Sequence, residues 1–193
     1  SVLQDMDKAA DRLCQAIQDG EQIAIFGDYD VDGATSSALL ARFFRAVSSP
    51  PRVYIPDRMK EGYGPTSAAM ELLAGEGARV VVTVDCGISS FEPLSVAKAA
   101  GLDVIVVDHH VAEASLPEAA AVINPNRLDE DGSLGHLAAV GVAFLLVIAV
   151  NRALRTAGWY SSRPEPKLLQ WLDLVALGTV CDVVPLKGLN RAL

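Results

Sequence analysis

The sequence predicts an α/β fold with a doubly wound, mostly parallel sheet and helices on both faces, followed by a helical C-terminal segment. Three observations favour this fold class. Short β-branched runs recur as far as residue 123, and stretches of helical length separate them. The runs are apolar throughout, without alternating polar positions. Such runs are typical of parallel strands that are buried on both faces.

Each element follows from a local pattern. Met6, Leu13 and Ile17 recur at helical spacing before Gly20, which predicts a leading helix within residues 1–20. Strands are expected in the apolar runs at 23–26, 53–55, 80–84, 104–107 and 121–123. Helices are expected between them over 36–47, 67–74 and 93–100. Over residues 135–193 the sequence predicts only helices, at 137–154 and 168–177.

Composition limits the classes of function. The 193 residues include 16 basic and 24 acidic side chains, a net charge of −8, so any contact with nucleic acid has to be local. The three cysteines, Cys14, Cys86 and Cys181, form no CxxC pair, and we expect buried, reduced thiols in a cytoplasmic protein. No export signal is visible. The longest apolar run, 137–150, is shorter than the ~17–25 residues that cross a bilayer, so no membrane partner is expected.

Acidic and imidazole side chains directly follow three of the predicted strands. They are Asp28, Asp30 and Asp32 after the first strand, Asp85 after the third, and Asp108, His109 and His110 after the fourth. The carboxyl ends of parallel strands share one edge of the sheet, and open α/β sheets bind their ligands there. In an extended segment, the first three carboxylates would point to the same side. The sequence therefore predicts one acidic crevice.

Metal ions are the expected occupants of this crevice. Five carboxylates would converge there with no lysine or arginine in the three segments, and such a charge density favours bound cations. Oxygen ligands with one or two imidazoles suit manganese, with magnesium as a substitute. We expect two ions that share one aspartate. A calcium-binding EF-hand loop starting at Asp28 is disfavoured, because Leu39 stands where that loop needs a glutamate.

Four motifs occur in order along the chain. They read Gly-Asp-Tyr-Asp-Val-Asp-Gly at 27–33, Val-Asp-Cys-Gly at 84–87, Asp-His-His at 108–110 and Val-Cys-Asp-Val-Val-Pro at 180–185. Together they resemble the DHH phosphoesterase superfamily, and most closely its RecJ branch of single-strand-specific exonucleases. The branch is indicated by Arg58 with Glu-Gly-Tyr-Gly at 61–64, by Ile-Asn-Pro-Asn at 123–126 and by Val-Gly-Val-Ala-Phe at 140–144.

The resemblance implies a role for each matching residue. Residues 1–193 would form the metal-dependent N-terminal core of a longer phosphoesterase. One ion would be held by Asp30 and Asp85 with Asp28, and the other by Asp32, Asp85, His109 and Asp182. The catalytic residues would be Asp85, Asp108, His109 and His110. Within this set, Asp108 would fix the His109 imidazole and His110 would face the scissile phosphate. Further substrate contacts would come from Arg58, from the backbone at Gly62 and Gly64, and from the helix N-terminus near Gly141, where free N–H groups favour anions.

The implied activity is two-metal hydrolysis of phosphodiester bonds in single-stranded DNA, from the 5′ end toward the 3′ end, in recombination and repair. Proteins of recombination and repair are then expected partners. Two alternatives stay open. One is a DHH phosphodiesterase or phosphatase that acts on short oligonucleotides, cyclic dinucleotides or nucleotide phosphates. The other is a scaffold that has lost catalysis; its signature would be a missing metal ligand, and none is missing from the motifs.

Overall fold

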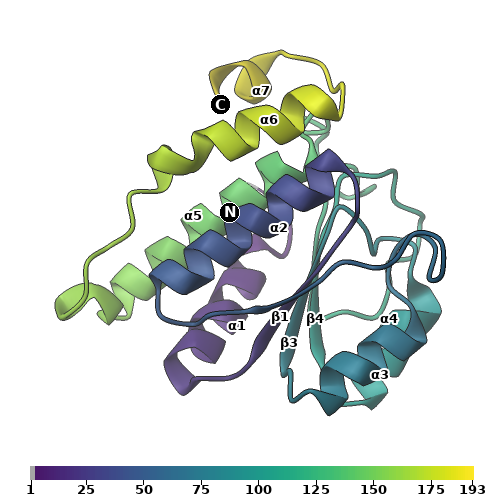
Figure 1. The fold of residues 1–193 in the computed structure, drawn as a ribbon. Helices are drawn as coiled ribbons and strands as arrows, with labels where there is room; N and C mark the ends of the chain where they lie inside the picture. The colour runs from purple at the N-terminus through teal and green to yellow at the C-terminus, as the bar shows by residue number, and fades with distance from the viewer. Residues whose placement is uncertain (1–2) are drawn as a thin grey trace.

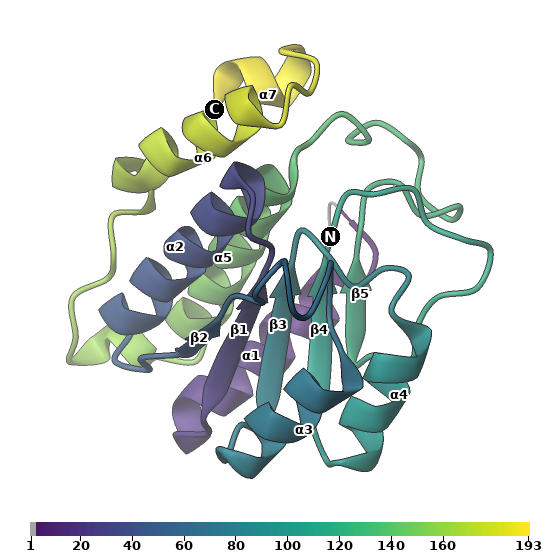
Figure 2. The same ribbon diagram turned by 45° about the vertical axis from the view of Figure 1, so that its right-hand side comes forward.

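The computed structural model describes residues 3–193; Ser1 and Val2, where the predicted leading segment begins, lie outside the described residues. Five strands form one sheet in the order β2-β1-β3-β4-β5, and every neighbouring pair is parallel. The strands are β1 (Ile23–Gly27), β2 (Arg52–Tyr54), β3 (Val80–Val84), β4 (Asp103–Val107) and β5 (Ala121–Ile123). Figures 1 and 2 show helices on both faces of the sheet. The predicted fold class is confirmed.

Alternate residues of each strand face two separate hydrophobic cores. On β1, Ile23 and Ile25 belong to the larger core, whereas Ala24 and Phe26 belong to the smaller one. The larger core is covered by α1 (Met6–Asp19), α2 (Val31–Ala46), α5 (Ala139–Thr156) and α6 (Leu172–Cys181). The smaller core is covered by α3 (Ser67–Gly75) and α4 (Phe91–Ala99). Burial on both faces explains why the central strands are apolar at nearly every position, with Thr83 as the buried polar exception.

The helix after β1 begins earlier than the sequence pattern indicated. The structure starts α2 at Val31, not at residue 36, because the Asp30 carboxylate accepts a hydrogen bond from the Gly33 N–H at 2.9 Å and so caps the helix. The residues from 31 to 35 that looked like loop are therefore the first turn of α2.

The C-terminal segment is helical as expected but differs in detail. The helix predicted at 168–177 is a 3₁₀ turn, Leu168–Trp171, followed by α6, which packs against α2 and α5 (Figure 1). A second 3₁₀ turn at Trp159–Ser161 and a short helix, α7 (Gly188–Ala192), were not predicted. The outer face of α6 is open, so Cys181 is exposed and its predicted burial is wrong, whereas Cys14 and Cys86 are buried.

One helix among the described residues, α5, has the length and hydropathy of a membrane-crossing segment. In this fold, 67% of that stretch is buried inside the protein, where α5 packs against α1, α2 and α6. The apolar composition of α5 is therefore accounted for by its central place in the larger core.

Candidate metal centre

The predicted site lies where the strand order of the sheet reverses direction. The connection after β1 leads to β2 on one side, whereas the connection after its other neighbour, β3, leads to β4 on the opposite side. Loops diverge at such a switch point and leave a crevice beyond the carboxyl ends of the strands. Asp28 and Asp85 directly follow β1 and β3, and His109 follows β4 after Asp108. The sheet topology therefore brings these motifs to one crevice.

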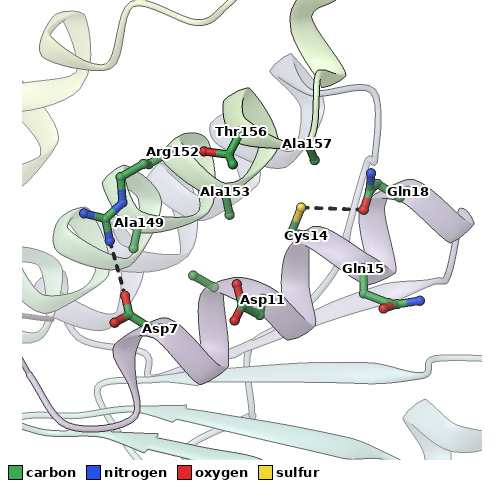
Figure 3. A pocket seen from close by; sticks show the side chains of 11 residues that line it. Asp7, Asp11, Cys14, Gln15, Gln18, Ala149, Arg152, Ala153, Thr156 and Ala157 are labelled. Carbon is green, nitrogen blue, oxygen red and sulfur yellow. Dashed lines mark hydrogen bonds and ion pairs between the residues drawn. The ribbon is translucent and has the colours of Figure 1, made fainter.

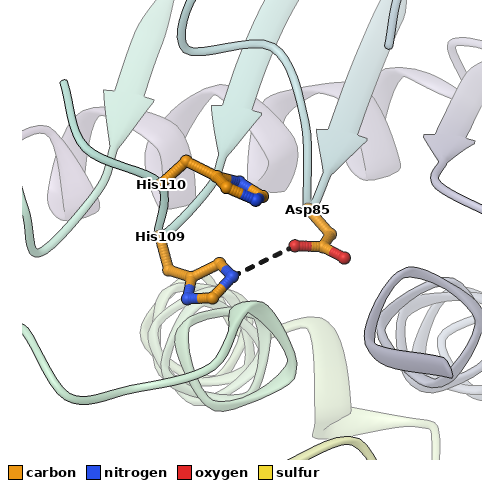
Figure 4. A group of neighbouring side chains, drawn as sticks. All are labelled: Asp85, His109 and His110. Carbon is orange, nitrogen blue, oxygen red and sulfur yellow. Dashed lines mark ion pairs between the residues drawn. The ribbon is translucent and has the colours of Figure 1, made fainter. Parts of the chain in front are cut away.

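The side chains gather in three overlapping groups around Asp85. These groups are Asp28 with Asp30 and Asp85, Asp32 with His109 and Asp182, and Asp85 with His109 and His110, and within each group the ligand atoms lie within 4.8 Å of one another. His109 Nε2 lies 3.3 Å from Asp85 Oδ1, 3.7 Å from Asp182 Oδ2 and 3.9 Å from Asp32 Oδ2. Figure 4 shows Asp85 and the two histidines at the tips of neighbouring strands. All six predicted ligands thus meet, including Asp182 from the end of α6.

The turn after β1 is not the extended segment that the sequence suggested. Because α2 starts at Val31, Asp28 precedes the helix, Asp30 caps it and Asp32 lies within its first turn. Gly33 permits this turn, since a Cβ atom there would lie 2.7 Å from the Cβ and the carbonyl oxygen of Asp28. The expectation of three carboxylates alternating along one side is wrong, and the helical turn sends Asp32 toward α5 instead.

Asp32 joins the site to the N-terminus of α5. Its Oδ2 accepts a hydrogen bond from the Ala139 N–H at 2.7 Å and its Oδ1 accepts one from the Val140 N–H at 2.8 Å. The next N–H, of Gly141, donates to the Ala138 carbonyl, and Gly141 is buried. The predicted phosphate contact near Gly141 is therefore wrong, because a carboxylate of the protein already occupies the positive end of this helix.

Asp108 holds His110, not His109. Its Oδ1 lies 2.7 Å from His110 Nδ1 and accepts the backbone N–H of His109, while its Oδ2 accepts the Ile88 N–H at 3.0 Å. The predicted bond from Asp108 to the His109 imidazole is wrong, since neighbouring residues of an extended chain point to opposite sides. Residues 108 and 110 share a side, which frees the His109 ring to face Asp85.

The backbone of Asp85 is strained and is held by a residue that the sequence analysis did not single out. Asp85 has a φ of 61°, in the left-handed region that a non-glycine residue rarely adopts. The Tyr63 hydroxyl donates a 2.9 Å hydrogen bond to the Asp85 carbonyl, and the Asp85 N–H donates to the Val107 carbonyl at 3.0 Å. In the sequence, this role could be suspected only from the presence of a tyrosine in the 61–64 segment. Its partner, Asp85, lies 22 residues away in the chain, and no local pattern connects the two.

Two asparagines of the 123–126 segment also support the site. The Asn124 side-chain amide donates to the His110 carbonyl at 2.9 Å, and that of Asn126 donates to the His109 carbonyl. Asn124 is fully buried. This segment entered the sequence analysis only as a mark of the family branch, and the structure shows that it fixes the backbone of both histidines.

The electrostatics of the cluster are those of an acid-rich, partly desolvated pocket. Burial raises the pKa of Asp32 to about 6, although the Val140 and Ala139 N–H groups oppose the shift. Burial raises the pKa of Asp85 to about 7, helped by the charges of Asp32 and Asp30. Burial alone would lower the pKa of His109, but its contact with Asp85 outweighs this and brings it to about 9. The carboxylates therefore outnumber the positive charge that the side chains supply.

Several buried ligand atoms accept no hydrogen bond from the described residues. They are Asp28 Oδ1, Asp85 Oδ1 and Asp182 Oδ2. Burying such oxygens unpaired is costly, and divalent cations satisfy them. A donor set of carboxylates with imidazole suits manganese or magnesium. The residues present thus fit a pair of divalent ions.

The predicted substrate contacts lie at the rim of the crevice. The Arg58 guanidinium lies over the Tyr29 ring, 5.2 Å from its centre, and its charge lowers the pKa of Asp28, which burial raises. Gly62 and Gly64 flank Tyr63 with positive φ angles of 80° and 78°, so the loop they form turns Tyr63 toward Asp85. The structure places these residues next to the cluster, and their contact with substrate stays a prediction.

Another hollow, of about 450 Å³, lies between α1 and α5 (Figure 3). Its polar side chains are partly engaged with each other: Arg152 pairs with Asp7 at 3.2 Å, and the Cys14 thiol donates to Gln18 at 3.7 Å. It contains none of the predicted site residues. The chemistry of the motifs is therefore confined to the crevice at the sheet edge.

Comparisons with known proteins agree with this geometry. The profile described as DHH family, N-terminal domain, matches residues 22–179. The single-stranded-DNA-specific exonuclease RecJ of Salmonella typhimurium is 44% identical over 194 residues, covering 99% of this chain and 34% of that protein. RecJ of Bacillus subtilis is 40% identical over 188 residues, covering 97% of this chain and 22% of that protein. The chain spans about a third or less of the length of these curated relatives.

Solved structures show the same relationship. The crystal structure of exonuclease RecJ bound to manganese matches with a TM-score of 0.85 and 36% identity, covering 98% of this chain and 46% of that one. RecJ from Thermus thermophilus in complex with Mn²⁺ matches with a TM-score of 0.80 and 33% identity, covering 100% of this chain and 26% of that one. Since the family profile spans most of the sequence and the fold and motifs agree with it, this chain belongs to the DHH family.

Proposed function

We propose that this chain holds two divalent cations, with manganese preferred and magnesium as a substitute, and hydrolyses phosphodiester bonds of single-stranded DNA. One observation carries the proposal: two groups of ligands, one containing Asp85 and the other containing its neighbour His109, lie side by side, and buried carboxylate oxygens in both accept no hydrogen bond from residues 3–193. The manganese complexes of related RecJ structures support the choice of metal.

The two groups divide the ligands between the ions. Asp28, Asp30 and Asp85 would hold one ion, and Asp32, His109 and Asp182 the other. Asp85 would be shared, because its Oδ1 lies 3.3 Å from His109 Nε2. Asp32 remains able to bind a metal, because each carboxylate oxygen has a second lone pair beyond its hydrogen bond to α5. When bound, such ions lower the pKa of a coordinated water and neutralise charge on the leaving oxygen.

The remaining residues orient the substrate and supply a proton. The Asp108 carboxylate raises the pKa of His110, which favours the protonated ring, and the second ring N–H would then be offered to a phosphate oxygen. His110 is about half exposed, so its imidazole is accessible to an incoming strand. Asp108 itself is fully buried and holds the ring in place. The pair of Asp108 and His110 would therefore contact the substrate, through the His110 ring, and not the metal ions.

The choice of substrate rests on the relatives. Those that match over nearly the whole of this chain are named single-stranded-DNA-specific exonucleases. We extend that activity to this protein, with hydrolysis from the 5′ end, with recombination and repair proteins as partners, and with residues 1–193 as the N-terminal catalytic core of a longer enzyme.

A single substitution tests the proposal. With manganese, the unmodified protein should release nucleotides from a labelled single strand, and Asp85→Ala should reduce the rate by at least about 100-fold, because loss of a shared ligand costs more than loss of a ligand's supporting partner. Glu113→Ala, which removes an exposed carboxylate outside the cluster, should leave the rate unchanged. Equal rates for Asp85→Ala and the unmodified protein, with both folded by circular dichroism, would contradict the assignment.

A further inference from the structure

A hollow of about 440 Å³ lies beside the cation cluster, between α2 and the edge strand β2 (Figure 2 shows these two elements near each other). Its volume falls in the range of small-molecule sites, about 300–1,000 Å³. Its lining includes Asp28, Tyr29, Ser37 and Arg45 together with small and branched apolar side chains of both elements. Asp28 belongs to both the hollow and the cation cluster, so the two adjoin.

The walls of the hollow are mostly apolar. On α2, Ala34, Ala38 and Ala41 recur at helical spacing and leave room that larger side chains would fill. Opposite them stand Val53 and Ile55, and Ile55 is 43% exposed. This composition suits a flat, apolar ring better than it suits a charged group.

Polar groups without partners stand among these apolar walls. The side chain of Ser37 is almost completely buried, and its hydroxyl has no hydrogen-bond partner among the described residues. The same holds for Asp28 Oδ1, which faces the cation cluster. The Ser37 hydroxyl lies against Gly27, where an added Cβ would be 2.1 Å from it, so it belongs to the wall and is not open to a ligand in the hollow.

Positive charge stands at both ends of the hollow. Arg45 lies on α2 at the end away from Asp28, and its side chain forms no ion pair or hydrogen bond within residues 3–193. At the other end, Arg58 stacks over the Tyr29 ring and its charge acts on Asp28. Guanidinium groups beside an apolar cavity are suited to phosphates.

From this combination we infer that the hollow between α2 and β2 binds an unpaired nucleotide of the strand whose phosphodiester bond lies at the cation cluster. The base would lie on the alanine face, and Arg45 would contact a phosphate farther along the strand. This inference rests on the proposed function and deepens it. A paired base cannot enter such a cavity, so the hollow would select a single strand over a duplex.

The decisive experiment fills the hollow and removes the base in turn. Ala38→Trp places a large side chain on the lining, and Ala46→Trp is the matched control, because Ala46 is an exposed position of α2 outside the hollow. Binding to fluorescent oligonucleotides would be measured by anisotropy with manganese in an Asp85→Asn background that prevents cleavage. Strands would carry a single abasic site at each of the four nucleotides nearest the labelled end.

One abasic position should weaken binding by about fivefold or more in the background protein and in the Ala46→Trp control, as expected for the loss of one well-packed base. Ala38→Trp should bind the intact strand as weakly as the abasic one, so that the penalty disappears. An abasic penalty that is the same with and without Ala38→Trp would overturn the inference, as would the absence of a penalty at every position.

Arg45→Ala provides a second test that does not depend on tolerance of a tryptophan. Loss of one phosphate contact should reduce the slope of log affinity against log salt by about 0.7 for a single strand. Arg42→Ala is the control, since Arg42 lies on the same helix over the Trp171 ring, 5.8 Å from its centre, and should leave the slope unchanged. Equal slopes for Arg45→Ala and the background protein would count against the phosphate contact.

Failure of this inference is separable from failure of the proposed function. If the unmodified protein cleaves the strand and Ala38→Trp keeps the full abasic penalty, the cation cluster functions as proposed and the hollow binds no nucleotide. If the unmodified protein cleaves no phosphodiester bond with manganese, the proposed activity is wrong, and the anisotropy results still decide the role of the hollow. If a protein segment were the true occupant of the hollow, Ala38→Trp would leave nucleotide binding unchanged, which again overturns the inference.

Discussion

The two halves of the cation cluster are built in different ways. Asp28 and Asp30 stand on one short turn between β1 and α2, so the local chain alone places them together. Asp32, His109 and Asp182 come from α2, from the loop after β4 and from the end of α6, and they meet only because three elements pack. Asp85 is grouped with Asp28 and Asp30, and it reaches the other half through His109, whose Nε2 lies 3.3 Å from Asp85 Oδ1.

This difference has an energetic side as well. Asp32 is 1% exposed and its pKa is raised to about 6, whereas Asp30 is exposed and engaged mainly in capping α2. The half assembled from distant elements therefore holds the more deeply buried charge, and the rest of the fold has to stabilise it. We expect substitutions that loosen the packing of α5 and α6 to displace Asp32, His109 and Asp182. The positions of Asp28 and Asp30 should change less.

The largest expected effect comes from removing one ligand from each half. Asp30→Asn keeps the capping oxygen of α2, and Asp182→Asn keeps the shape of its side chain. Each variant should lose one of two manganese ions by isothermal titration calorimetry, and each should lose hydrolysis by at least about 100-fold. Two ions bound by both variants would show that the division of the cluster into halves is wrong.

The next effect is a dependence of stability on pH in a chelating buffer. Folded Asp32 and Asp85 keep their protons up to about pH 6 and about pH 7. In the unfolded chain, carboxyl groups lose theirs near about pH 4, so the folded state binds more protons across that window and the free energy of unfolding falls as pH rises. For His109, whose pKa is raised to about 9, stabilisation is present below about pH 6.5 and is lost as pH rises through 9.

Both contributions have the same sign, so the melting temperature in chelator should fall from pH 5 to pH 9, by about 5 °C or more if the sum reaches a few kcal/mol. Manganese should reverse the fall, because metals bind the deprotonated ligands. Differential scanning calorimetry would measure this, with Asp85→Asn as the control that flattens the curve. A melting temperature that rises with pH in chelator would contradict the buried charge of the cluster.

A smaller effect on stability, opposite in sign, is expected when two helical glycines are replaced by alanine. A Cβ at Gly178 on α6 would lie 2.4 Å from Thr35 Oγ1, 2.8 Å from Val140 Cγ1 and 3.1 Å from Asp32 Oδ1, so Gly178→Ala should destabilise the fold by about 1–3 kcal/mol. It should also weaken the ion held by Asp182 before the other ion. Gly75→Ala at the end of α3 meets no atom within 4 Å and should stabilise by about 0.5–1 kcal/mol. Chemical denaturation of both variants tests the contrast, and the same sign for both would contradict it.

The smallest effect should come from Tyr63, and it should weaken metal binding equally in both halves of the cluster. Tyr63→Phe removes the hydrogen bond to the Asp85 carbonyl and should cost about 1 kcal/mol of stability. Because Asp85 is shared, the affinity for both ions should fall by a similar factor. Calorimetric titration would show this, and weakening confined to one ion would mean that Tyr63 supports only one half of the cluster.

Most of the fold could be predicted from the sequence, because a buried strand or helix shows a local pattern of apolar residues. Strands such as Val80–Val84 are buried at every position, and their β-branched runs, almost entirely apolar, indicate that directly. The start of α2 was missed since the capping role of Asp30 competed with the interpretation of an acidic, extended loop. The short helix α7 has only five residues and too little periodicity to stand out.

The sequence by itself determined the sheet, the edge where its motifs gather and the charge that calls for cations, since each of these depends on residues adjacent in the chain or on the shared direction of parallel strands. Only the tertiary structure decided that Asp108 holds His110, that Asp32 caps α5 and that Tyr63 fastens Asp85. These contacts join residues through side-chain direction and helix packing. The approach of α6 at Gly178, which brings Asp182 to His109, is a property of three packed helices that no local pattern records.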